Sequence, residues 1–427
     1  MRTPGAPAKS PAKATLTPTR PPNHPTPTLI PTPPQRLPLP ALLALATAVF
    51  ITSLTETLPA GLLPAMSADL GVSESATGQT VTVYAIGTAL TAIPLTAATA
   101  GWRRKRLLLV AMAGFAAANT VTAVSGNYTL TMGARFVAGV AAGLAWALLA
   151  GYARRLAPVH LQGKAIAVAM AGIPVALSLG VPAGTFLGKV LSWQVAFLVM
   201  TGLTVGLLGW IAALVPDLPG QEPGGAKTPM LRTLRVPGVA PVLLVTLLLV
   251  LAHTVLYTYI ATFLDALGMG GSTDLVLLLF GAASLVSIWI TGALIHRGLR
   301  ALTLASVLLI GVAAAVLAAF SDTPALVYVA VALWGLGWGG APTLLQTAAG
   351  AAGDANGDAG GGTADAAQAM LVTLWNVAMA GGGVFGGVLL GLVGTSSFPW
   401  TILLLLAPVL LTVVAARRHG FPARNPA

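Results

Sequence analysis

Long apolar runs alternate with short polar segments along most of the chain. From Leu39 onward, each run contains about 20 residues or more, enough for a helix to cross the roughly 30 Å of hydrocarbon in a bilayer. The pattern predicts an all-α polytopic membrane protein with twelve transmembrane helices, over residues 39–66, 76–100, 105–125, 128–153, 162–188, 193–215, 239–266, 273–295, 301–320, 324–350, 365–393 and 398–416.

The polar segments divide these spans into two six-helix halves. Residues 216–238 (PDLPGQEPGGAKTPMLRTLRVPG) are predicted to be a cytoplasmic linker between an N-terminal half, 38–215, and a C-terminal half, 239–417. Two halves of six spans are typical of transporters. Residues 1–37 form a Pro/Thr-rich basic arm that we expect to be disordered, ahead of a retained first span, and residues 418–427 form a cytoplasmic tail.

Composition and charge agree with this topology. Only 8% of the residues are charged, whereas a soluble domain has about a quarter of its residues charged. With both termini in the cytoplasm, 20 of the 22 Lys and Arg residues lie in cytoplasmic segments, as the positive-inside rule requires. The net charge of +11 therefore reflects loop residues and does not indicate nucleic-acid binding. The predicted location is the inner (plasma) membrane.

The segment ITSLTETLPAGLLPAM, residues 51–66, places the carboxylate of Glu56 inside the first span. A charge at the bilayer centre costs about 2.5–3.5 kcal/mol on insertion scales, so such a residue normally faces the bundle interior or a water-filled cavity. Glu56 is therefore a candidate site for a proton or a cationic substrate. The alternative is a structural carboxylate that forms a hydrogen bond at a helix kink near Pro59.

Arg135, in MGARFVAGVAAG, is the only basic residue inside a predicted span. Counted from the outer ends of their spans, Glu56 lies roughly 15 Å deep and Arg135 roughly 10 Å deep. Similar depths allow the two residues to pair or to line one cavity. A purely structural ion pair is the alternative.

His253, in LLLVLAHTVLYTYIATFLD, lies near the middle of the seventh span. An imidazole titrates near neutral pH and could relay a proton, although a neutral buried histidine is an equal alternative. Other polar or amphipathic residues in the spans are weaker candidates for a substrate cavity, and packing is the alternative for the tyrosines. These residues are Asn119, Tyr257, Tyr259, Gln346, Trp375 and Asn376.

The fifth span, AGIPVALSLGVPAGTFLG, is rich in small residues and proline. Four glycines fall near one face at helical spacing: Gly172, Gly180, Gly184 and Gly188. Small residues allow close helix approach, and Pro174 and Pro182 favour kinks. We expect a thin, bendable helix at a moving interface between the two halves, with ordinary glycine-rich packing as the alternative.

The sequence contains no enzyme motif. The loops have no paired His/Glu metal-ligand motif, no phosphate-binding GxxxxGK[ST] loop and no nucleophile with a nearby base, and the chain has no cysteine. We expect no catalytic residue, metal site or cofactor. Any transport would then draw its energy from an ion gradient.

Together, these stretches resemble the major facilitator superfamily, within it the drug:proton antiporter group that includes arabinose, sugar, purine-nucleoside and chloramphenicol exporters. The resemblance covers about residues 38–416. TETLPAGLLPAMSADLGVSESATGQTVTVYAIG resembles the family's first span and the loop that follows, with Glu56 at its acidic position, and Arg135 falls at the span-4 arginine. LGVPAGTFLG, with Pro182 and the glycines of the fifth span, resembles the antiporter motif. YTYIATFL, LWGLGWGGAPTLLQTAA and QAMLVTLWNVAMAGGGVFGG resemble spans 7, 10 and 11.

Two cytoplasmic loops depart from the family's pattern. Arg104 and Lys105 match the end of the loop 2–3 motif G-x-x-x-D-R-x-G-R-[RK], but Ala100 stands at the Asp position. The loop 8–9 copy, GALIHRGLR, has His296 in place of Asp and keeps basic residues at Arg297 and Arg300. The resemblance implies that both loops gate the cytoplasmic side, without the usual aspartates.

The resemblance implies a secondary active transporter that works by alternating access of two halves around a central site. Glu56 would carry a proton inward while a drug, sugar or nucleoside leaves, and Arg135 would hold the carboxylate form. His253 is a further proton-coupling candidate. The expected partners are the substrate, protons and the lipid bilayer, with no nucleic acid and a monomeric chain. The alternatives are proton-coupled uptake and a non-transporting membrane receptor or scaffold.

Overall fold

The computed structural model describes residues 1, 5, 37–99, 101–158, 161–220, 230–354 and 362–421. Within these ranges the regular elements are helices, and no strand occurs. Ala100 and most of the N-terminal arm lie outside the described residues. So do residues 221–229 of the linker, the Gly/Asp loop at 355–361 and the tail from 422 onward.

The helices follow the predicted apolar runs. The first half of the chain contains α1 (Leu39–Leu70), α2 (Glu74–Ala98), α3 (Arg104–Val124), α4 (Tyr128–Leu156), α5 (Gln162–Met170), α6 (Gly172–Val175), α7 (Val181–Val190) and α8 (Trp193–Leu214). The second half contains α9 (Met230–Leu234), α10 (Val239–Thr258), α11 (Ile260–Ala266), α12 (Thr273–Phe320), α13 (Pro324–Trp338), α14 (Ala341–Asp354), α15 (Gly362–Leu392) and α16 (Ser397–Ala415).

Eleven helical stretches in the described part of the chain are long and apolar enough to cross a membrane. They correspond to eleven of the twelve predicted spans. The expected second span corresponds to α2, a 25-residue helix whose side chains are not all described and which is not among the eleven. The count of twelve and the cytoplasmic position of the termini remain predictions.

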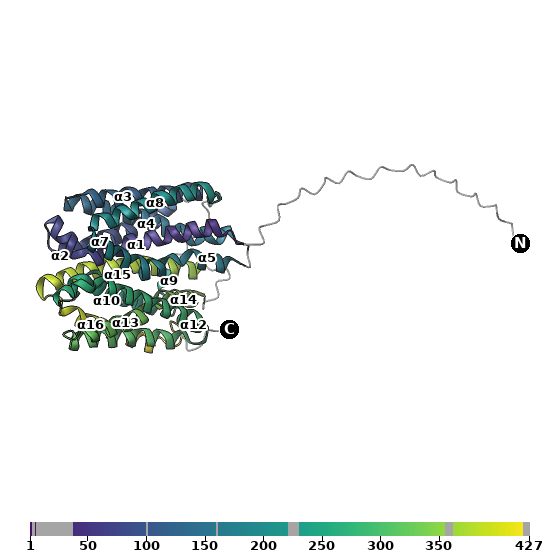
Figure 1. Ribbon diagram of the computed structural model, residues 1–427. Coiled ribbons are helices and arrows are strands. Elements are labelled where there is room, and N and C mark those ends of the chain that lie inside the picture. The colour runs from purple at the N-terminus through teal and green to yellow at the C-terminus, as the bar shows by residue number, and fades with distance from the viewer. Residues whose placement is uncertain are drawn as a thin grey trace.

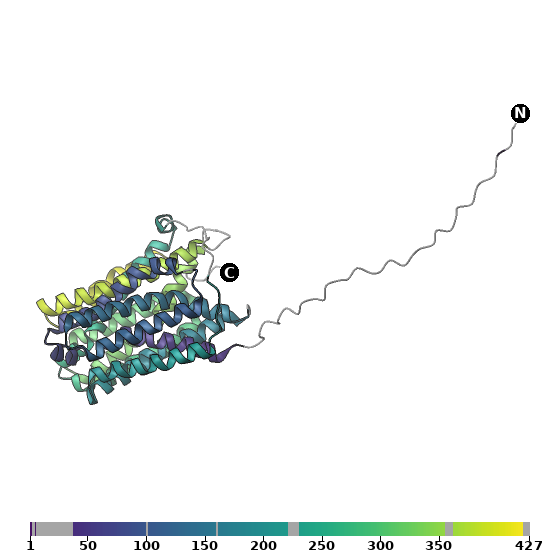
Figure 2. The ribbon, with the colours of Figure 1, turned by 90° about the horizontal axis from the view of Figure 1, so that it is seen from above.

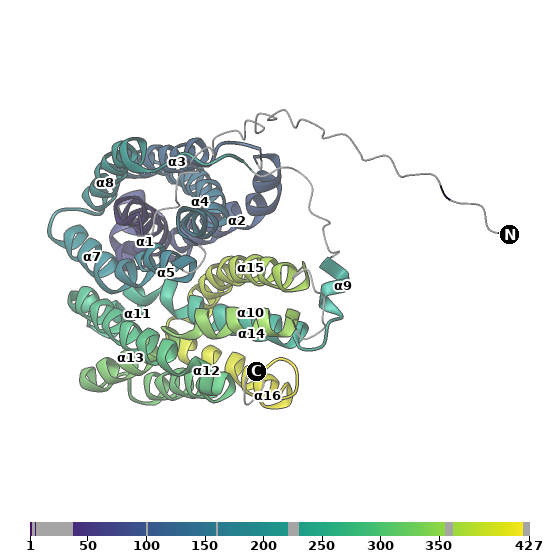
Figure 3. The same cartoon turned by 90° about the vertical axis from the view of Figure 1, so that its right-hand side faces the viewer.

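The helices gather into two groups that follow the order of the chain (Figure 1). Seen along the bundle axis, α1 to α8 form one group and α10 to α16 the other (Figure 3). The long helices of both groups run roughly side by side (Figure 2). We call the end of the bundle that holds the α1–α2 turn, at Gly71, the Gly71 end.

Local signals explain where several helices begin and end. Helix α1 ends because Gly71 takes a left-handed conformation (φ 64°) that favours glycine. The side chains of Asn127 and Ser192 accept hydrogen bonds from the backbone of Leu130 and Val195, which caps the N-termini of α4 and α8. These caps satisfy backbone donors that the helices leave unpaired.

Some predicted spans are broken helices. The fifth span divides into α5, α6, a π-helical turn at Ala176–Gly180 and α7. Pro174 and Pro182 each remove a backbone donor from the helical ladder, which accounts for the irregular stretch. The seventh span breaks at Tyr259, between α10 and α11. The eighth and ninth spans run together as α12, which is non-helical at Gly298, where the chain passes between them.

The two halves meet mainly toward the Gly71 end. Helix α2 lies along α15, where Ser75 Oγ donates to Gly387 O at 2.8 Å and Gln79 Nε2 donates to Gly383 O at 3.2 Å. Lys189, at the end of α7, pairs with Asp274, at the start of α12, at 3.7 Å. Further hydrogen bonds across this contact join Gln79 to Tyr259, Thr82 to Ala380 and Lys189 to Gly271.

Candidate functional site

The candidate site begins with Glu56, in the middle of α1. Its side chain is half-buried, and it forms no hydrogen bond or close ion pair with another described residue. Pro59 lies inside the continuous helix α1, so Glu56 is not seen capping a kink there. The structure thus places a carboxylate inside the bundle without a neutralising contact.

Arg135, on α4, is fully buried and lies within electrostatic range of Glu56. Its Nε donates to Thr80 O at 3.4 Å, and its guanidinium carbon lies 4.9 Å from the ring centroid of Tyr84. Neither terminal nitrogen, Nη1 or Nη2, has a hydrogen-bond partner among the described residues. A guanidinium with two unsatisfied nitrogens, beside an unpaired carboxylate, is unusual in a protein interior because burying charge is costly.

Polar groups from α1 and α3 extend this cluster. Asn119, on α3, is fully buried and donates from Nδ2 to the Thr55 hydroxyl at 3.2 Å, while its Oδ1 has no partner among the described residues. The hydroxyl of Thr80 is likewise buried and unpartnered. Three candidates from sequence, Glu56, Arg135 and Asn119, therefore lie in one half of the bundle, on helices that pack together.

Tyr84 belongs to the same cluster but was missed from the sequence. It is fully buried on α2, its hydroxyl donates to Thr52 O at 3.2 Å, and its ring faces Arg135. The only signal in the sequence was a tyrosine within an apolar run. Such a residue is more often a packing residue, and only its contact with Arg135 gives it a role in the site.

His253, on α10, stands in a cluster of aromatic rings in the other half. Its ring stacks on Trp338 with centroids 3.5 Å apart and planes 5° apart. Tyr257, Trp334 and Phe280 surround it at centroid distances of 5.0, 5.2 and 5.9 Å. We call these five residues the aromatic wall. Trp375, on α15, joins the wall through Trp338, at 5.6 Å.

Tyr257 connects the aromatic wall to the cluster around Glu56. Its phenol lies beside Thr57, on α1, and within electrostatic range of Glu56. Two groups of residues that are far apart in sequence thus meet where α1 faces α10. We call this meeting point the central site.

Tyr259 lies elsewhere, in the contact between the halves. Its hydroxyl donates to Gly383 O at 2.8 Å and accepts from Gln79 Nε2 at 3.3 Å. Packing was the alternative to a cavity for the two tyrosines, and Tyr259 packs between the halves. Residues two apart on a helix point to nearly opposite sides, so Tyr257 and Tyr259 reach different places.

The remaining cavity candidates are less closely placed. Asn376 is buried and donates to Val372 O on its own helix, α15, which satisfies it locally. Gln346, on α14, is exposed, and its backbone carbonyl accepts from the Gln368 side chain at 2.6 Å. Neither hydrogen bond joins these residues to Glu56, Arg135 or the aromatic wall.

The glycine face of the fifth span packs within the N-terminal half. A Cβ at Gly172 would collide with the backbone of α1 at Ala46 and Phe50. Side chains of α1 also cover Gly180, Gly184 and Gly188. The glycine face therefore lies on α1, while another side of the fifth span meets the C-terminal half, as expected for a helix at the interface; movement at that interface stays a prediction. The opposite half contacts the fifth span through Gly281, on α12, where a Cβ would collide with Ser178.

The loop 2–3 residues are held by the end of the N-terminal half. Arg103 pairs with Asp217 at 2.6 Å, beyond the end of α8. Lys105 donates to Ala212 O at 2.7 Å, and the backbone of Arg104 donates to Leu218 O at 2.9 Å. Asp217, which the sequence did not single out, thus supplies a carboxylate to this loop although Ala100 replaces the aspartate of the motif.

The second basic loop is held by α16. Arg300 donates from Nη2 to Val414 O at 3.0 Å, and Arg297 is exposed. His296 lies in α12, and its side chain is outside the described part of the structure.

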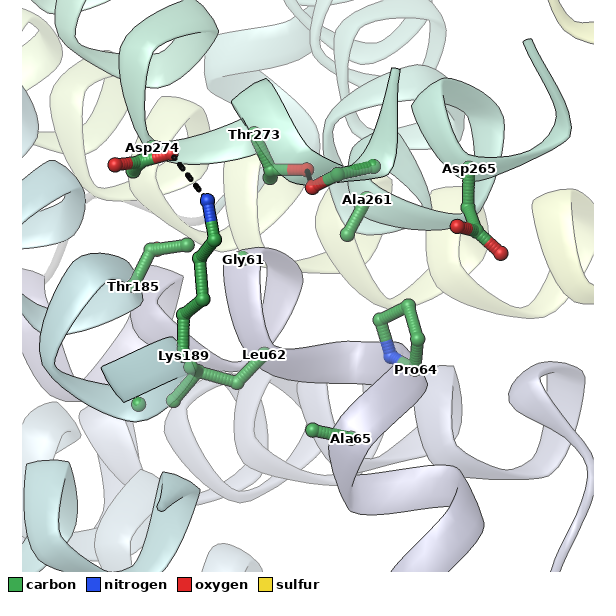
Figure 4. Close-up of a pocket in the computed structure, with 12 residues that line it drawn as sticks. Gly61, Leu62, Pro64, Ala65, Thr185, Lys189, Ala261, Asp265, Thr273 and Asp274 are labelled. Atoms are coloured by element: carbon green, nitrogen blue, oxygen red, sulfur yellow. Dashed lines mark hydrogen bonds and ion pairs between the residues drawn. The ribbon is translucent and has the colours of Figure 1, made fainter. Parts of the chain in front are cut away.

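A pocket of about 180 Å³ lies between the halves at the Gly71 end (Figure 4). Lys189 reaches across it from α7 toward Asp274, and Asp265 and Pro64 lie on its other side (Figure 4). Lys189 also donates to Gly271 O. Among the described residues, no group of three or more His, Cys, Asp or Glu side chains could hold a metal ion.

The family model described as Major Facilitator Superfamily matches residues 45–364. The chain is 29% identical over 384 residues to the transcription regulatory protein OpdE of Pseudomonas aeruginosa, covering 88% of this chain and 93% of that protein. It is 30% identical over 365 residues to a chloramphenicol efflux pump of Mycobacterium tuberculosis, covering 81% and 84%. It is 28% identical over 309 residues to the purine ribonucleoside efflux pump NepI of Salmonella paratyphi B, covering 72% and 78%.

A solved structure has the same fold. The crystal structure of the human organic anion transporter MFSD10 (TETRAN) matches with a TM-score of 0.66 at 17% identity, covering 90% of this chain and 100% of that one. The family model matches more than half of the sequence, over the helices that build the central site. The chain therefore belongs to the Major Facilitator Superfamily, a family of multi-pass membrane transporters and not of enzymes.

Proposed function

We propose that this transporter exports a small molecule in exchange for protons, by alternating access of its two halves. The observation that carries this proposal is a pair of opposite charges inside the bundle, the fully buried Arg135 and the half-buried Glu56, that form no close ion pair. Arg135 has two terminal nitrogens without a partner among the described residues, and Glu56 lies near it without an ion pair. Charged groups inside a protein that lack a fixed partner are candidates for binding a proton or a polar group of a substrate.

The chemistry follows from charge balance in a poorly hydrated site. When Glu56 carries a proton it is neutral, and the central site can close without burying an extra negative charge. When the proton leaves, Arg135 stabilises the carboxylate electrostatically. A substrate that occupies the central site would compete for the same groups, which couples its departure to proton uptake. His253 is a second candidate proton carrier.

The contacts between the halves support a direction of access. They lie toward the Gly71 end, where α2 contacts α15 and Lys189 pairs with Asp274. The positive-inside rule puts the Gly71 end outside the cell. The structure then corresponds to a state closed to the outside, and loops 2–3 and 8–9 lie on the cytoplasmic side. We propose twelve spans, both termini in the cytoplasm, a monomer and the inner membrane as the location.

The relatives suggest which substrates to test first. Two of them are named as exporters, one of chloramphenicol and one of purine ribonucleosides. The decisive experiment uses purified protein in liposomes that carry an internal pH indicator, with chloramphenicol or inosine loaded inside. An imposed proton gradient should drive export of one of these compounds, and the substrate should in turn evoke a proton signal.

Glu56→Gln should abolish the proton signal and the acceleration of export by the gradient. Glu74→Gln, at the start of α2, is the matched control because it makes the same change outside the central site. Export by Glu56→Gln that follows the pH gradient as in the wild type would refute the proposed role. Accumulation inside the vesicle driven by a gradient of the same direction would indicate uptake instead.

A regulatory function is the second candidate, because one relative is named as a transcription regulatory protein. A membrane receptor on this fold would bind a small molecule without moving it. Binding of a compound by the purified protein, with no flux of that compound in liposomes under any gradient, would favour the receptor.

A further inference from the structure

The aromatic wall contains three buried polar atoms that no group in the described chain satisfies. They are Nδ1 of His253, Nε1 of Trp334 and the hydroxyl oxygen of Tyr257, which lies beside Thr57 but forms no hydrogen bond of normal geometry with it. The side chains that carry them are 8%, 2% and 6% exposed, respectively. Buried polar atoms are nearly always hydrogen-bonded, so three exceptions within one cluster of rings point to a partner from outside the chain.

The wall also has the geometry of a stacking surface. The ring centroids of Trp338 and Trp375 lie 5.6 Å apart, and the ring planes are tilted by 41° to each other. Trp375 is only half-buried. Trp338 lies against His253 on its other side. Aromatic rings attract other flat rings in offset or tilted arrangements at such separations. The partly open ring of Trp375 and the polar edges of the wall therefore belong to one surface.

The cluster around Glu56, in the other half of the bundle, adds further unpartnered hydrogen-bonding groups. Arg135 contributes two nitrogens that can only donate, and Asn119 contributes an oxygen that can only accept. Trp334 adds another donor, and Tyr257 can donate or accept. Because donors predominate, the fitting ligand carries several acceptor atoms around a flat ring. A polyol such as arabinose has no aromatic ring and cannot stack on the wall.

We infer that the aromatic wall, with Trp375, is the substrate-selecting surface of the central site, and that it selects planar aromatic or heteroaromatic compounds bearing hydrogen-bond acceptors. This inference rests on the proposed function for its location at the transport site. It goes further by naming the ligand chemistry and the residues that read it. Simple sugars have no aromatic ring to stack on the wall, so we expect them not to be preferred substrates.

Equilibrium binding to the purified full-length protein tests this directly. Isothermal titration should show binding of inosine or chloramphenicol, which carry flat rings with acceptor groups, and at least tenfold weaker binding of arabinose. Tyr257→Phe removes one hydroxyl and keeps the ring, so it should weaken binding by about tenfold. Trp338→Leu removes the ring that lies between His253 and Trp375 and holds the stacking surface together, so it should weaken binding by more than tenfold.

Two matched variants control for general damage. Tyr328→Phe makes the same change on α13, outside the wall, and Trp400→Leu does so at a position that is 62% exposed on α16. Both should bind as the wild type does. The inference is overturned if arabinose binds as tightly as the ring compounds, if neither ring compound binds to folded protein, or if Tyr257→Phe and Trp338→Leu keep wild-type affinity.

Binding and transport outcomes separate this inference from the proposed function. Ring-selective binding without proton-coupled export would leave the aromatic wall as the selecting surface and refute the exporter. Proton-coupled export of arabinose, lost in Glu56→Gln but unchanged in Trp338→Leu, would support the exporter and refute the selecting surface.

Discussion

At the residue scale, the opposite charges of Arg135 and Glu56, inside the N-terminal half, stabilise each other. Arg135 is fully buried, and its direct contacts are the carbonyl of Thr80 and the ring of Tyr84. A cation over an aromatic face is stabilised by about 0.5–2 kcal/mol, which is less than the cost of burying it. The nearby Glu56 therefore supplies part of the stabilisation when it is ionised.

A double-mutant cycle tests that interaction. Arg135→Gln leaves Glu56 without its positive neighbour and should lower the melting temperature of the protein in detergent at neutral pH. Arg135→Gln combined with Glu56→Gln removes both charges and should restore part of the loss, because a single buried charge costs about 3–5 kcal/mol once its partner is removed. Strictly additive effects of the two substitutions would show that the residues do not interact.

The external pH should change the rate of export through the protonation of Glu56 beside Arg135. Since the proposed cycle loads Glu56 with a proton from outside, export should become faster as the external pH falls at constant internal pH. In Glu56→Gln the side chain is neutral at every pH, so the rate should be flat. The measurement is the initial rate of export from liposomes across a series of external pH values, and an unchanged slope in the variant would contradict it.

At the element scale, the fifth span has two faces with different tasks. Its glycine face packs on α1 inside the N-terminal half, and its π-helical turn contacts α12 of the other half at Ser178 and Gly281. Small residues permit both approaches, but only the second contact joins the halves. A larger side chain on the glycine face should therefore lower the stability of the protein. A larger side chain at the contact with α12 should change how the two halves are positioned relative to each other.

Gly172→Leu should destabilise the protein, because its side chain would meet the backbone of α1. Overpacking of this kind typically costs 1–3 kcal/mol, a clear decrease in melting temperature. Gly133→Leu, on α4, is the control because nothing lies within 4 Å of a Cβ there. Equal melting temperatures for the two variants would contradict the packing seen here.

Gly281→Leu should instead separate the two halves where α12 meets the fifth span. We expect it to retain most of its thermal stability and to favour conformations that are open at the Gly71 end. Gly292→Leu, on the same helix and free of contacts, is the matched control. Because the chain has no cysteine, single introduced cysteines can report accessibility without background labelling. Unchanged labelling near Gly71 in Gly281→Leu would count against the separation.

At the scale of the whole molecule, the ion pair between Lys189 and Asp274 joins the halves at the Gly71 end (Figure 4). The Lys189 side chain is 49% exposed and that of Asp274 is 23% exposed, so solvent weakens the pair. Exposed pairs contribute about 0.2–1 kcal/mol, equivalent to a change of up to roughly fivefold in a population ratio. In the proposed cycle, the pair would therefore adjust the equilibrium between the two access states without locking either one.

Lys189→Gln should shift the population toward states open at the Gly71 end by up to fivefold. Spin labels on cysteines introduced at Val190 and Leu275, both exposed and on opposite halves, would report the change as longer distances. Lys164→Gln makes the same substitution on α5 and should leave the distances unchanged. Identical distance distributions for wild type and Lys189→Gln would show that the pair does not hold the halves together.

The amino-acid sequence was enough to predict the class of protein, the positions of most spans and the charged residues within them. These features are local, because a bilayer requires about 20 apolar residues per helix and penalises each buried charge wherever the chain folds. Periodicity alone could not reveal that the seventh span breaks at Tyr259 or that the fifth span contains a π-helical turn.

The contacts between residues distant in sequence became evident only from the folded chain. It placed Tyr84 under Arg135, joined His253 to the aromatic wall and assigned Tyr259 to the contact between halves. It also turned the glycine face of the fifth span toward α1. The physical reason is that nearly every helix of a membrane protein is apolar on most sides. Hydrophobicity therefore does not select its neighbours, and shape and the pairing of a few polar groups do.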